Sequence, residues 1–211
     1  MGAGLTIVID YGLCNIDSMV RALEECGAHK VVPTSDPLVV EKADRIVLPG
    51  VGSFDAGMRN LHKLQLVDCI SQAAASANIP FLGACLGMQL MAKYGEEGGS
   101  CTEGLGFVEA SVVRLESQNG EDRVPHIGWN EVQPTSEAAL FNKNEGIRDY
   151  YFVHSYHMKL ADPAKEAGHT PYCGGITSVV ELPDRPIFGT QFHPEKSQKA
   201  GFALLRNFLE I

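Results

Sequence analysis

Several features that mark other classes of protein are missing from this sequence of 211 residues. No apolar run approaches the ~20 residues that a transmembrane helix needs, and no basic residue precedes the first apolar run, as an export signal would require. Positive charges are few, with 17 lysines and arginines against 26 acidic residues and a net charge of −9. A nucleic-acid or membrane-surface binder would carry basic clusters, so we expect neither partner.

The six cysteines form no C-x-x-C pair; they stand at positions 14, 26, 69, 85, 101 and 173. That spacing fits neither a zinc site nor a dense disulfide framework. His154 and His157 could suggest a metal pair, but an odd spacing on one strand points two side chains to opposite faces. We therefore expect no metal or other cofactor, and reduced thiols in a cytoplasmic protein.

The first half of the sequence alternates short apolar runs with helical patterns. The runs that we interpret as buried strands are Leu5–Ile9, Lys30–Val32, Arg45–Leu48 and Phe81–Ala84. Helical patterns end at Gly27, follow Asp36-Pro37, and extend over Phe54–Ala77 and Met88–Tyr94. This alternation predicts an α/β fold with an open, mostly parallel sheet flanked by helices.

After Gly95 the pattern changes to strands joined by turns that contain glycine, proline or asparagine. The predicted strands are Val108–Leu115, Asn130–Gln133, Tyr150–His157, Ile176–Leu182 and Ile187–Gln191. Their β-branched and aromatic content indicates antiparallel extensions of the same sheet, and a helix over Lys199–Leu209 closes the chain. With no linker, repeat or low-complexity tract, residues 1–211 are predicted to form a single domain.

The segment Gly83-Ala84-Cys85-Leu86-Gly87 lies directly between a predicted buried strand and a helix. It has the G-x-nucleophile-x-G form of a nucleophile elbow, with sulfur in place of a serine hydroxyl. Small residues permit the sharp turn, the helix N-terminus favours the reactive thiolate, and the Leu86 amide is placed to bind an oxyanion. A buried structural cysteine is the alternative, which we prefer for the other five cysteines.

A thiol nucleophile needs a base, and the base needs an orienting carboxylate. His193 and Glu195 follow the last predicted strand and supply both groups, with Pro194 stiffening the link between them. The H-x-E pattern alone is typical of many surface histidines. Together with the elbow, it predicts a triad of Cys85, His193 and Glu195.

The segment Pro49-Gly50-Val51-Gly52 ends the third predicted strand. A glycine-flanked turn can aim a backbone N–H into the crevice above the carboxyl ends of the sheet, and adjacent parallel strands would bring it beside Cys85. Glycine on both sides of Val51 also lets this peptide rotate at small steric cost, so that either its N–H or its carbonyl faces the site. An ordinary strand-exit turn is the alternative.

The elbow, extended to Met88-Gln89, and the run Phe192–Ser197 resemble the triad glutamine amidotransferases. Three further runs are similar to the glutaminase subunits of imidazole glycerol phosphate synthases: Leu48–Phe54, His126–Asn130 and Tyr151–Tyr156. The resemblance covers essentially the whole chain and implies the flavodoxin-like class I glutamine amidotransferase fold. It further implies a heterodimer with a (β/α)₈-barrel cyclase, which receives ammonia and makes imidazole glycerol phosphate and an aminoimidazole carboxamide nucleotide in histidine biosynthesis.

The same resemblance implies a role for each motif residue. Cys85 would attack the carboxamide of glutamine, the amides of Val51 and Leu86 would hold the oxyanion, and His193, oriented by Glu195, would move the protons. The groups implied to bind glutamine are Gly50, Gly52, Gln89, Ser155 and Tyr156. The side chains implied to face the partner are Trp129, Tyr151 and Lys196; core or surface packing is the alternative for the two aromatic ones.

Two positions depart from the family pattern. Cys14 replaces a glycine in Asp10–Asn15, which would strain or reshape the loop if that position needs a positive φ, and Ala84 stands where isoleucine is usual. Neither change removes a catalytic group. A paralogue that aminates or amidinates a surface-polysaccharide sugar remains an alternative. Two other classes are less favoured: related cysteine hydrolases that act alone lack the H-P-E run, and a non-catalytic binding module would not need an intact triad.

Overall fold

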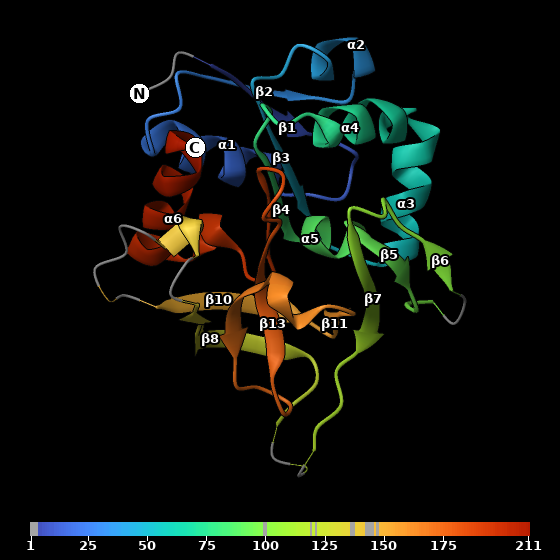
Figure 1. The fold of residues 1–211 in the computed structure, drawn as a ribbon, viewed down its shortest axis with the longest axis vertical. Coiled ribbons are helices and arrows are strands. Elements are labelled where there is room, and N and C mark those ends of the chain that lie inside the picture. The colour runs from blue at the N-terminus through green and yellow to red at the C-terminus, as the bar shows by residue number, and fades with distance from the viewer. Residues whose placement is uncertain are drawn as a thin grey trace.

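A sheet of eight strands runs through the molecule, and the first five strands in its spatial order are parallel (Figure 1). The computed structural model describes residues 4–98, 101–118, 120, 122–135, 138–141, 146 and 148–211. The parallel strands are β2 (Lys30–Thr34), β1 (Leu5–Ile9), β3 (Arg45–Gly50), β4 (Phe81–Cys85) and β14 (Ile187–Thr190). The antiparallel strands β13 (Ile176–Glu181), β12 (Glu166–Thr170) and β9 (Gln133–Pro134) continue the sheet beyond β14.

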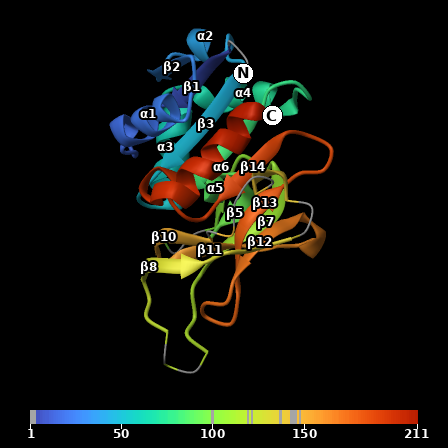
Figure 2. The same ribbon diagram turned by 90° about the vertical axis from the view of Figure 1, so that its left-hand side faces the viewer.

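Helices cover both faces of the parallel part (Figure 2). One face carries α1 (Ile16–Glu25) and α6 (Gln198–Glu210); the other carries α2 (Pro37–Val40), α3 (Phe54–Lys63), α4 (Leu66–Ala75) and α5 (Leu86–Leu90). Successive strand residues point to opposite faces, so Ile7 and Ile9 join one buried cluster while Val8 joins the other. The predicted α/β fold is confirmed. No helix in the described ranges is long and apolar enough to span a membrane.

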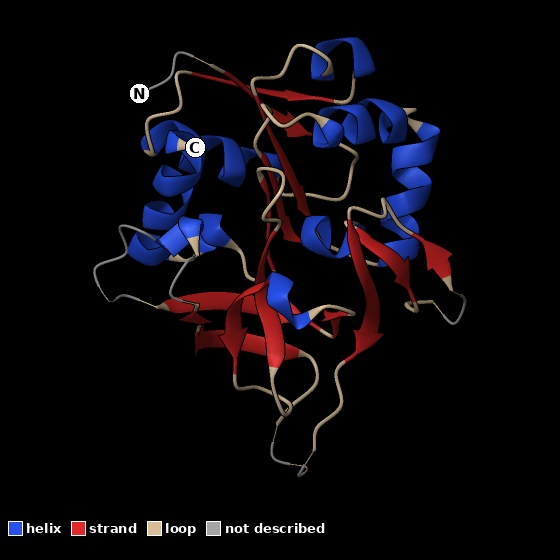
Figure 3. Ribbon diagram, viewed as in Figure 1, coloured by secondary structure: helices blue, strands red, loops and turns tan. Residues whose placement is uncertain are grey.

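The chain beyond α5 also builds two smaller sheets (Figure 3). One pairs β8 (His126–Glu131) with β10 (Asp149–His154). The other has the order β11 (Tyr156–Leu160), β7 (Val108–Arg114), β5 (Ala92–Gly95) and β6 (Thr102–Glu103). The predicted antiparallel extension of the main sheet is therefore correct for β13 and for Gln133 in β9, and wrong for β7, β8, β10 and β11. β12, β5 and β6 were not predicted as strands. β14 was also expected to be antiparallel, yet it runs parallel to β4.

The long helix predicted over Phe54–Ala77 is two helices, α3 and α4, separated at Gln65, which has a left-handed φ of 57°. A straight helix over that range would be about 36 Å long, roughly twice the length of the strands that it covers. The break lets Leu61 on α3 and Leu66 on α4 both reach full burial. No glycine or proline lies at the break, so the sequence carries no local signal for it.

The helix predicted over Met88–Tyr94 was also too long. α5 ends at Leu90, and Ala92 already belongs to β5. Residues 88–92 are all buried, Gln89 included, so the pattern of apolar residues does not distinguish a helix from a strand here.

Candidate active site

The carboxyl ends of three neighbouring parallel strands bring the predicted catalytic segments together. Gly50 at the end of β3 is the register partner of Cys85 at the end of β4, which places the glycine-flanked loop beside the elbow as predicted. β14 pairs with β4 on its other side, with Thr190 opposite Ala84, and the chain then continues to His193. Parallel strands end at the same edge of a sheet, so the thiol and the imidazole approach each other across this edge.

The elbow depends on its two glycines. Cys85 has φ 53° and ψ −110°, a strained conformation for a residue with a side chain. A Cβ on Gly83 would lie 2.6 Å from Met91 Sδ, and one on Gly87 would lie 1.7 Å from the Leu48 carbonyl oxygen. Only glycine therefore lets the turn pack against β3 and α5. The helix behind Cys85 has just five residues, so any help to the thiolate comes from its first amides rather than from a long dipole.

His193 and Glu195 form a buried pair. His193 Nδ1 lies 2.8 Å from Glu195 Oε1, and the two side chains are 3% and 5% exposed. Burial alone would lower the pKa of His193, but the nearby Cys85 and Glu195 outweigh burial and raise it to about 10. The other ring nitrogen, Nε2, is buried and has no hydrogen-bond partner among the described residues. The carboxylate thus fixes the ring through Nδ1 and leaves Nε2 for a proton transfer.

The loop after β3 holds its Val51 amide away from the predicted oxyanion site. Val51 N donates to the Leu13 carbonyl oxygen at 2.7 Å, while Gly52 takes a φ of 104°. A Cβ on Gly50 would lie 2.0 Å from Tyr11 Oη, a buried hydroxyl without a hydrogen-bond partner among the described residues. An oxyanion role for Val51 thus requires the peptide to rotate out of this conformation.

The loop that carries Cys14 is not strained at that position. Gly12 has a positive φ of 82°, whereas Cys14 is not among the residues with a positive φ. Burial raises the pKa of the Cys14 thiol to about 11, with Asp10 adding to the shift. The departure from the family's glycine is therefore accommodated by an ordinary backbone conformation and a poorly ionised thiol.

The predicted glutamine-binding residues converge near Cys85. Gln89 Nε2 donates to the Tyr156 carbonyl oxygen at 2.7 Å and to Gln191 Oε1 at 3.1 Å. Ser155 lies between β10 and β11 and breaks the single strand predicted over Tyr150–His157. This break turns the chain at the site, since Cys85 Sγ lies 3.9 Å from the carbonyl oxygen of Val153, two residues earlier.

The predicted partner-facing aromatic residues share one exposed face of the β8–β10 sheet. Trp129 and Tyr151 are register partners, and their ring centroids are 6.0 Å apart. Trp129 is 49% exposed and Ile127, two residues earlier on the same face, is 61% exposed. Lys196 lies in the turn Pro194–Lys196 that directly follows His193. Exposed large apolar side chains grouped in this way are typical of a protein-binding surface.

Three buried polar residues of the site were not predicted: Gln191, His126 and His154. Gln191 Nε2 lies 3.9 Å from Cys85 Sγ, and His126 Nδ1 lies 3.0 Å from His154 Nε2. A glutamine at the end of a predicted buried strand was the available signal for Gln191. The two histidines are 28 positions apart, and only the pairing of β8 with β10 brings them together.

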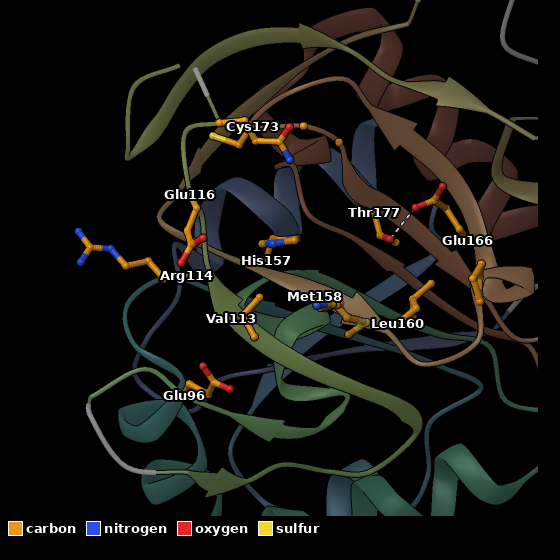
Figure 4. A pocket seen from close by; sticks show the side chains of 15 residues that line it. Glu96, Val113, Arg114, Glu116, His157, Met158, Leu160, Glu166, Cys173 and Thr177 are labelled. Atoms are coloured by element: carbon orange, nitrogen blue, oxygen red, sulfur yellow. Dashed lines mark hydrogen bonds between the residues drawn. The ribbon is translucent and has the colours of Figure 1, made fainter. Parts of the chain in front are cut away.

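A separate cavity of about 670 Å³ opens among β7, β11 and the β12–β13 pair (Figure 4). None of the predicted site residues lines it. His157 does, together with Glu116, Glu166 and Cys173, whereas His154 turns toward His126. The two histidines therefore lie in different environments.

This fold, with a cysteine elbow and a buried histidine–carboxylate pair at one sheet edge, belongs to a known class. Residues 7–211 match the family described as glutamine amidotransferase class-I, and the chain belongs to that family. Two solved structures share the fold: PurLQS from Thermotoga maritima (TM-score 0.74, 17% identity, 99% of each chain covered) and a glutamine amidotransferase (TM-score 0.71, 17% identity, 99% of this chain and 98% of that one).

Curated relatives show a similarity to one subgroup of this family. The chain is 41% identical over 204 residues to imidazole glycerol phosphate synthase subunit HisH 1 of Campylobacter jejuni (strain RM1221), covering 97% of this chain and 98% of the relative. It is 43% identical over 211 residues to subunit HisH of Ruegeria pomeroyi, with the same coverage. The family resemblance predicted from the motifs is confirmed.

Proposed function

We propose that the chain is the glutaminase subunit of an imidazole glycerol phosphate synthase. As one cytoplasmic domain of residues 1–211, it hydrolyses L-glutamine to glutamate and ammonia. The ammonia passes to a cyclase subunit of (β/α)₈-barrel type, which makes imidazole glycerol phosphate and an aminoimidazole carboxamide nucleotide in histidine biosynthesis. The names of the relatives support this pathway. The observation that carries the chemistry is the buried His193–Glu195 pair, which follows β14, the strand next to the one that ends in the Cys85 elbow.

The proposed reaction has two steps. The proton of the Cys85 thiol passes to His193 Nε2, and the sulfur bonds to the side-chain carbonyl carbon of glutamine. The same proton then goes from Nε2 to the departing nitrogen, so that ammonia leaves and a γ-glutamyl thioester forms. His193 Nε2 then takes a proton from water, and the resulting hydroxide breaks the thioester to release glutamate and the thiol. Glu195 stabilises the ring in its charged form, in keeping with the raised pKa of His193.

The oxyanion donors explain how the activity can be controlled. The Leu86 amide opens α5 directly behind the nucleophile, but the Val51 amide is bonded to Leu13. Rotation of that peptide would turn the N–H into the site. Because loss of one oxyanion donor costs about 10²–10³ in rate, the conformation described here is a low-activity one. Docking of the partner and its acceptor would favour the rotated one through differential contacts.

The partner surface is proposed on the exposed face that carries Ile127, Trp129 and Tyr151, with Lys196 nearby. Large apolar groups at this face, next to an active site, fit a subunit interface with an aromatic centre. The backbone of β10 links this face to the nucleophile, because the Val153 carbonyl oxygen lies 3.9 Å from Cys85 Sγ.

The central test uses the purified two-subunit complex. Cys85→Ala should abolish glutamine-dependent synthesis by a factor on the order of 10⁴ or more, yet leave synthesis from added ammonium salts intact, because the acceptor chemistry lies on another chain. Cys101→Ala, at an exposed cysteine, is the matched control and should change neither rate. If both activities fall together in a folded Cys85→Ala complex, Cys85 is structural.

The pathway is tested by affinity purification of the tagged chain. Co-purification of a histidine-pathway cyclase supports the proposal. Capture of a sugar-modifying barrel instead would replace that pathway by the paralogous amination or amidination of a surface sugar and leave the glutaminase chemistry unchanged.

A further inference from the structure

A chain of hydrogen bonds between buried groups runs from β8 to the nucleophile. Asn130 Nδ2 lies 3.4 Å from His126 Nε2, and His126 Nδ1 lies 3.0 Å from His154 Nε2. His154 Nδ1 lies 2.8 Å from the Tyr156 carbonyl oxygen. That oxygen also accepts from Gln89 Nε2 at 2.7 Å, so both of its lone pairs are used.

The series of hydrogen bonds continues from the Gln89 side chain to the Cys85 sulfur. The second N–H of the Gln89 amide reaches Gln191 Oε1 at 3.1 Å, and Gln191 Nε2 lies 3.9 Å from Cys85 Sγ. Both glutamine side chains are buried; Gln191 is completely inaccessible to solvent. These contacts join the carbonyl of the glutamine-binding turn to a donor that faces the nucleophile.

The Tyr156 carbonyl oxygen can only accept hydrogen bonds, and this decides which group donates and which accepts in every hydrogen bond of the series. His154 must therefore carry its proton on Nδ1, which leaves Nε2 as an acceptor and makes His126 Nδ1 the donor to it. On the other side, Gln89 must present its NH₂ group to the carbonyl, so Gln191 presents Oε1 to Gln89 and NH₂ to Cys85. A reversed Gln191 would place two donors against each other and an oxygen against the sulfur.

Burial keeps the two histidines neutral, as this direction requires. It lowers the pKa of His126 to about 4 and that of His154 to about 3. The His126 ring stacks on Phe152 at 4.6 Å and on Tyr172 at 3.8 Å between centroids. Stacking holds the His126 ring in place, and its Nδ1 proton then orients His154.

We infer that His154, oriented by His126, is a positioning residue for glutamine hydrolysis: it holds the Tyr156 carbonyl and, through the Gln89 and Gln191 amides, a hydrogen-bond donor at Cys85. The inference rests on the proposed function, since it needs Cys85 to be the nucleophile. Neither histidine touches the reacting atoms. Their effect is to keep the donor on Gln191, rather than its oxygen, facing a thiolate, which strengthens a charge-assisted contact.

The test compares three variants in the assembled complex. His154→Leu removes both ring nitrogens, whereas His154→Asn keeps a donor close to the position of Nδ1. His126→Phe keeps the ring for stacking but removes the donor to His154. We expect His154→Leu to lower kcat/KM for glutamine about ten- to hundredfold, because His126 Nδ1 and the Tyr156 carbonyl oxygen each lose a buried hydrogen-bond partner. His154→Asn should recover most of this loss. The kcat/KM of His126→Phe should fall between those of the two His154 variants.

Two readouts separate positioning from folding. All three variants should remain bound to the cyclase subunit in size-exclusion chromatography and keep the wild-type circular dichroism spectrum, which shows that they are folded. The rate at which iodoacetamide alkylates Cys85 should fall in His154→Leu and recover in His154→Asn. His29→Gln, at an exposed histidine, is the matched control and should match the wild type. Equal losses in His154→Leu and His154→Asn with both variants folded and bound to the cyclase subunit, or no loss in either, would overturn the inference.

Failure of the proposed function gives a different pattern. In that case Cys85→Ala itself keeps glutamine-dependent synthesis, whatever the histidine variants do. If Cys85→Ala is inactive with glutamine and His154→Leu is not impaired, the nucleophile stands and only the positioning role is wrong.

Discussion

Two pairs of buried side chains that include a histidine lie near Cys85, and the pKa values of their histidines are shifted in opposite directions. His193 faces the carboxylate of Glu195, and its pKa is raised to about 10. His154 faces the carbonyl of Tyr156 and the ring of His126, and its pKa is lowered to about 3. Both histidines are almost inaccessible to solvent, so burial alone does not decide the charge.

The group that each histidine ring faces decides the direction of its pKa shift. A carboxylate stabilises the charged imidazolium, whereas a carbonyl oxygen accepts a hydrogen bond but adds no full charge, so desolvation prevails. A charged ring can give up or take a proton during a reaction, and a neutral ring of fixed tautomer can only orient its neighbours. The four predictions below test this contrast, beginning with the largest effect.

Glu195→Gln should remove the carboxylate that stabilises the charged ring of His193. The amide can donate to His193 Nδ1 and so favour the wrong tautomer, which we expect to lower the glutamine-dependent rate by about 10⁴. The pKa of His193 should fall well below 10, because burial is then opposed by Cys85 alone. Glutamate production and the pH titration of the His193 ring by NMR measure the two effects.

Glu166→Gln is the matched control, since Glu166 faces His169 in a more exposed pair of the same kind. It should leave the glutaminase rate and the His193 titration as in the wild type. A Glu195→Gln enzyme with near-normal activity would show that the charged pair is not the catalytic one.

The isolated chain should be a poor glutaminase. With the Val51 amide bonded to Leu13, one proposed oxyanion donor is turned away from the site, and we expect the rate to rise at least about a hundredfold when the partner and its acceptor bind. Steady-state glutamate production with and without the partner measures the change. Full activity of the purified chain alone would contradict both the rotation of this peptide and the subunit role.

Thiol labelling should single out Cys85. A glutamine-mimicking diazo ketone should modify it far faster than the other five cysteines. Burial raises the pKa of Cys14 and Cys26 to about 11, so at pH 7 only about one part in 10⁴ of each is thiolate. Peptide mapping by mass spectrometry gives the order of modification.

Iodoacetamide, which has no glutamine-like group, is the matched reagent for this experiment. It should also modify Cys101, the exposed cysteine. Labelling of Cys14 or Cys101 before Cys85 by the diazo ketone would contradict the assignment of the nucleophile.

The smallest expected effect is on how the stability of the fold depends on pH. The folded pKa of His126 and His154 lies below the unfolded value of 6.5, so their neutral forms stabilise the fold fully above pH 6.5 and this contribution is lost as the pH falls toward about 4 and 3. His193 acts in the opposite sense: its contribution is full below pH 6.5 and is lost as the pH rises through about 10. The titratable neighbours that contribute to these shifts are Asp122 beside His126, and His126, His157 and His193 beside His154.

Urea unfolding of the chain at pH 7.5 and pH 5 measures how much stability is lost on the acidic side. We expect His126→Phe to lose less stability than the wild type over this interval, by on the order of 1–2 kcal/mol. His29→Gln should follow the wild type. An identical pH dependence in His126→Phe would show that His126 is not held neutral by the fold.

Local patterns were sufficient for most of the parallel strands and for the predicted triad. Continuous apolar runs identified β1, β3 and β4, because strands buried on both faces need no polar positions. The elbow around Cys85 was visible because its glycines are required within a few residues of the nucleophile. His193 and Glu195 are two positions apart, so their pairing was also a local property.

The remaining features depend on contacts between distant segments. The break at Gln65 and the short α5 follow from what these segments pack against, and the separate β8–β10 sheet follows from pairing across 20 or so residues rather than from strand composition. The orientation of the Val51 peptide is set by the Leu13 carbonyl on another loop. The His126–His154 pair exists only through the register of two strands.

The sequence by itself determined the class of fold, the family, and the residues proposed for catalysis, because each of these is written in short segments with strict steric or chemical requirements. Only the tertiary structure decided the charge of each buried histidine and whether the Val51 amide is available. Both properties depend on which polar group lies within about 3 Å of an atom, since hydrogen bonds and desolvation act over that distance. The neighbours that supply these groups come from segments that the chain brings together only when it folds.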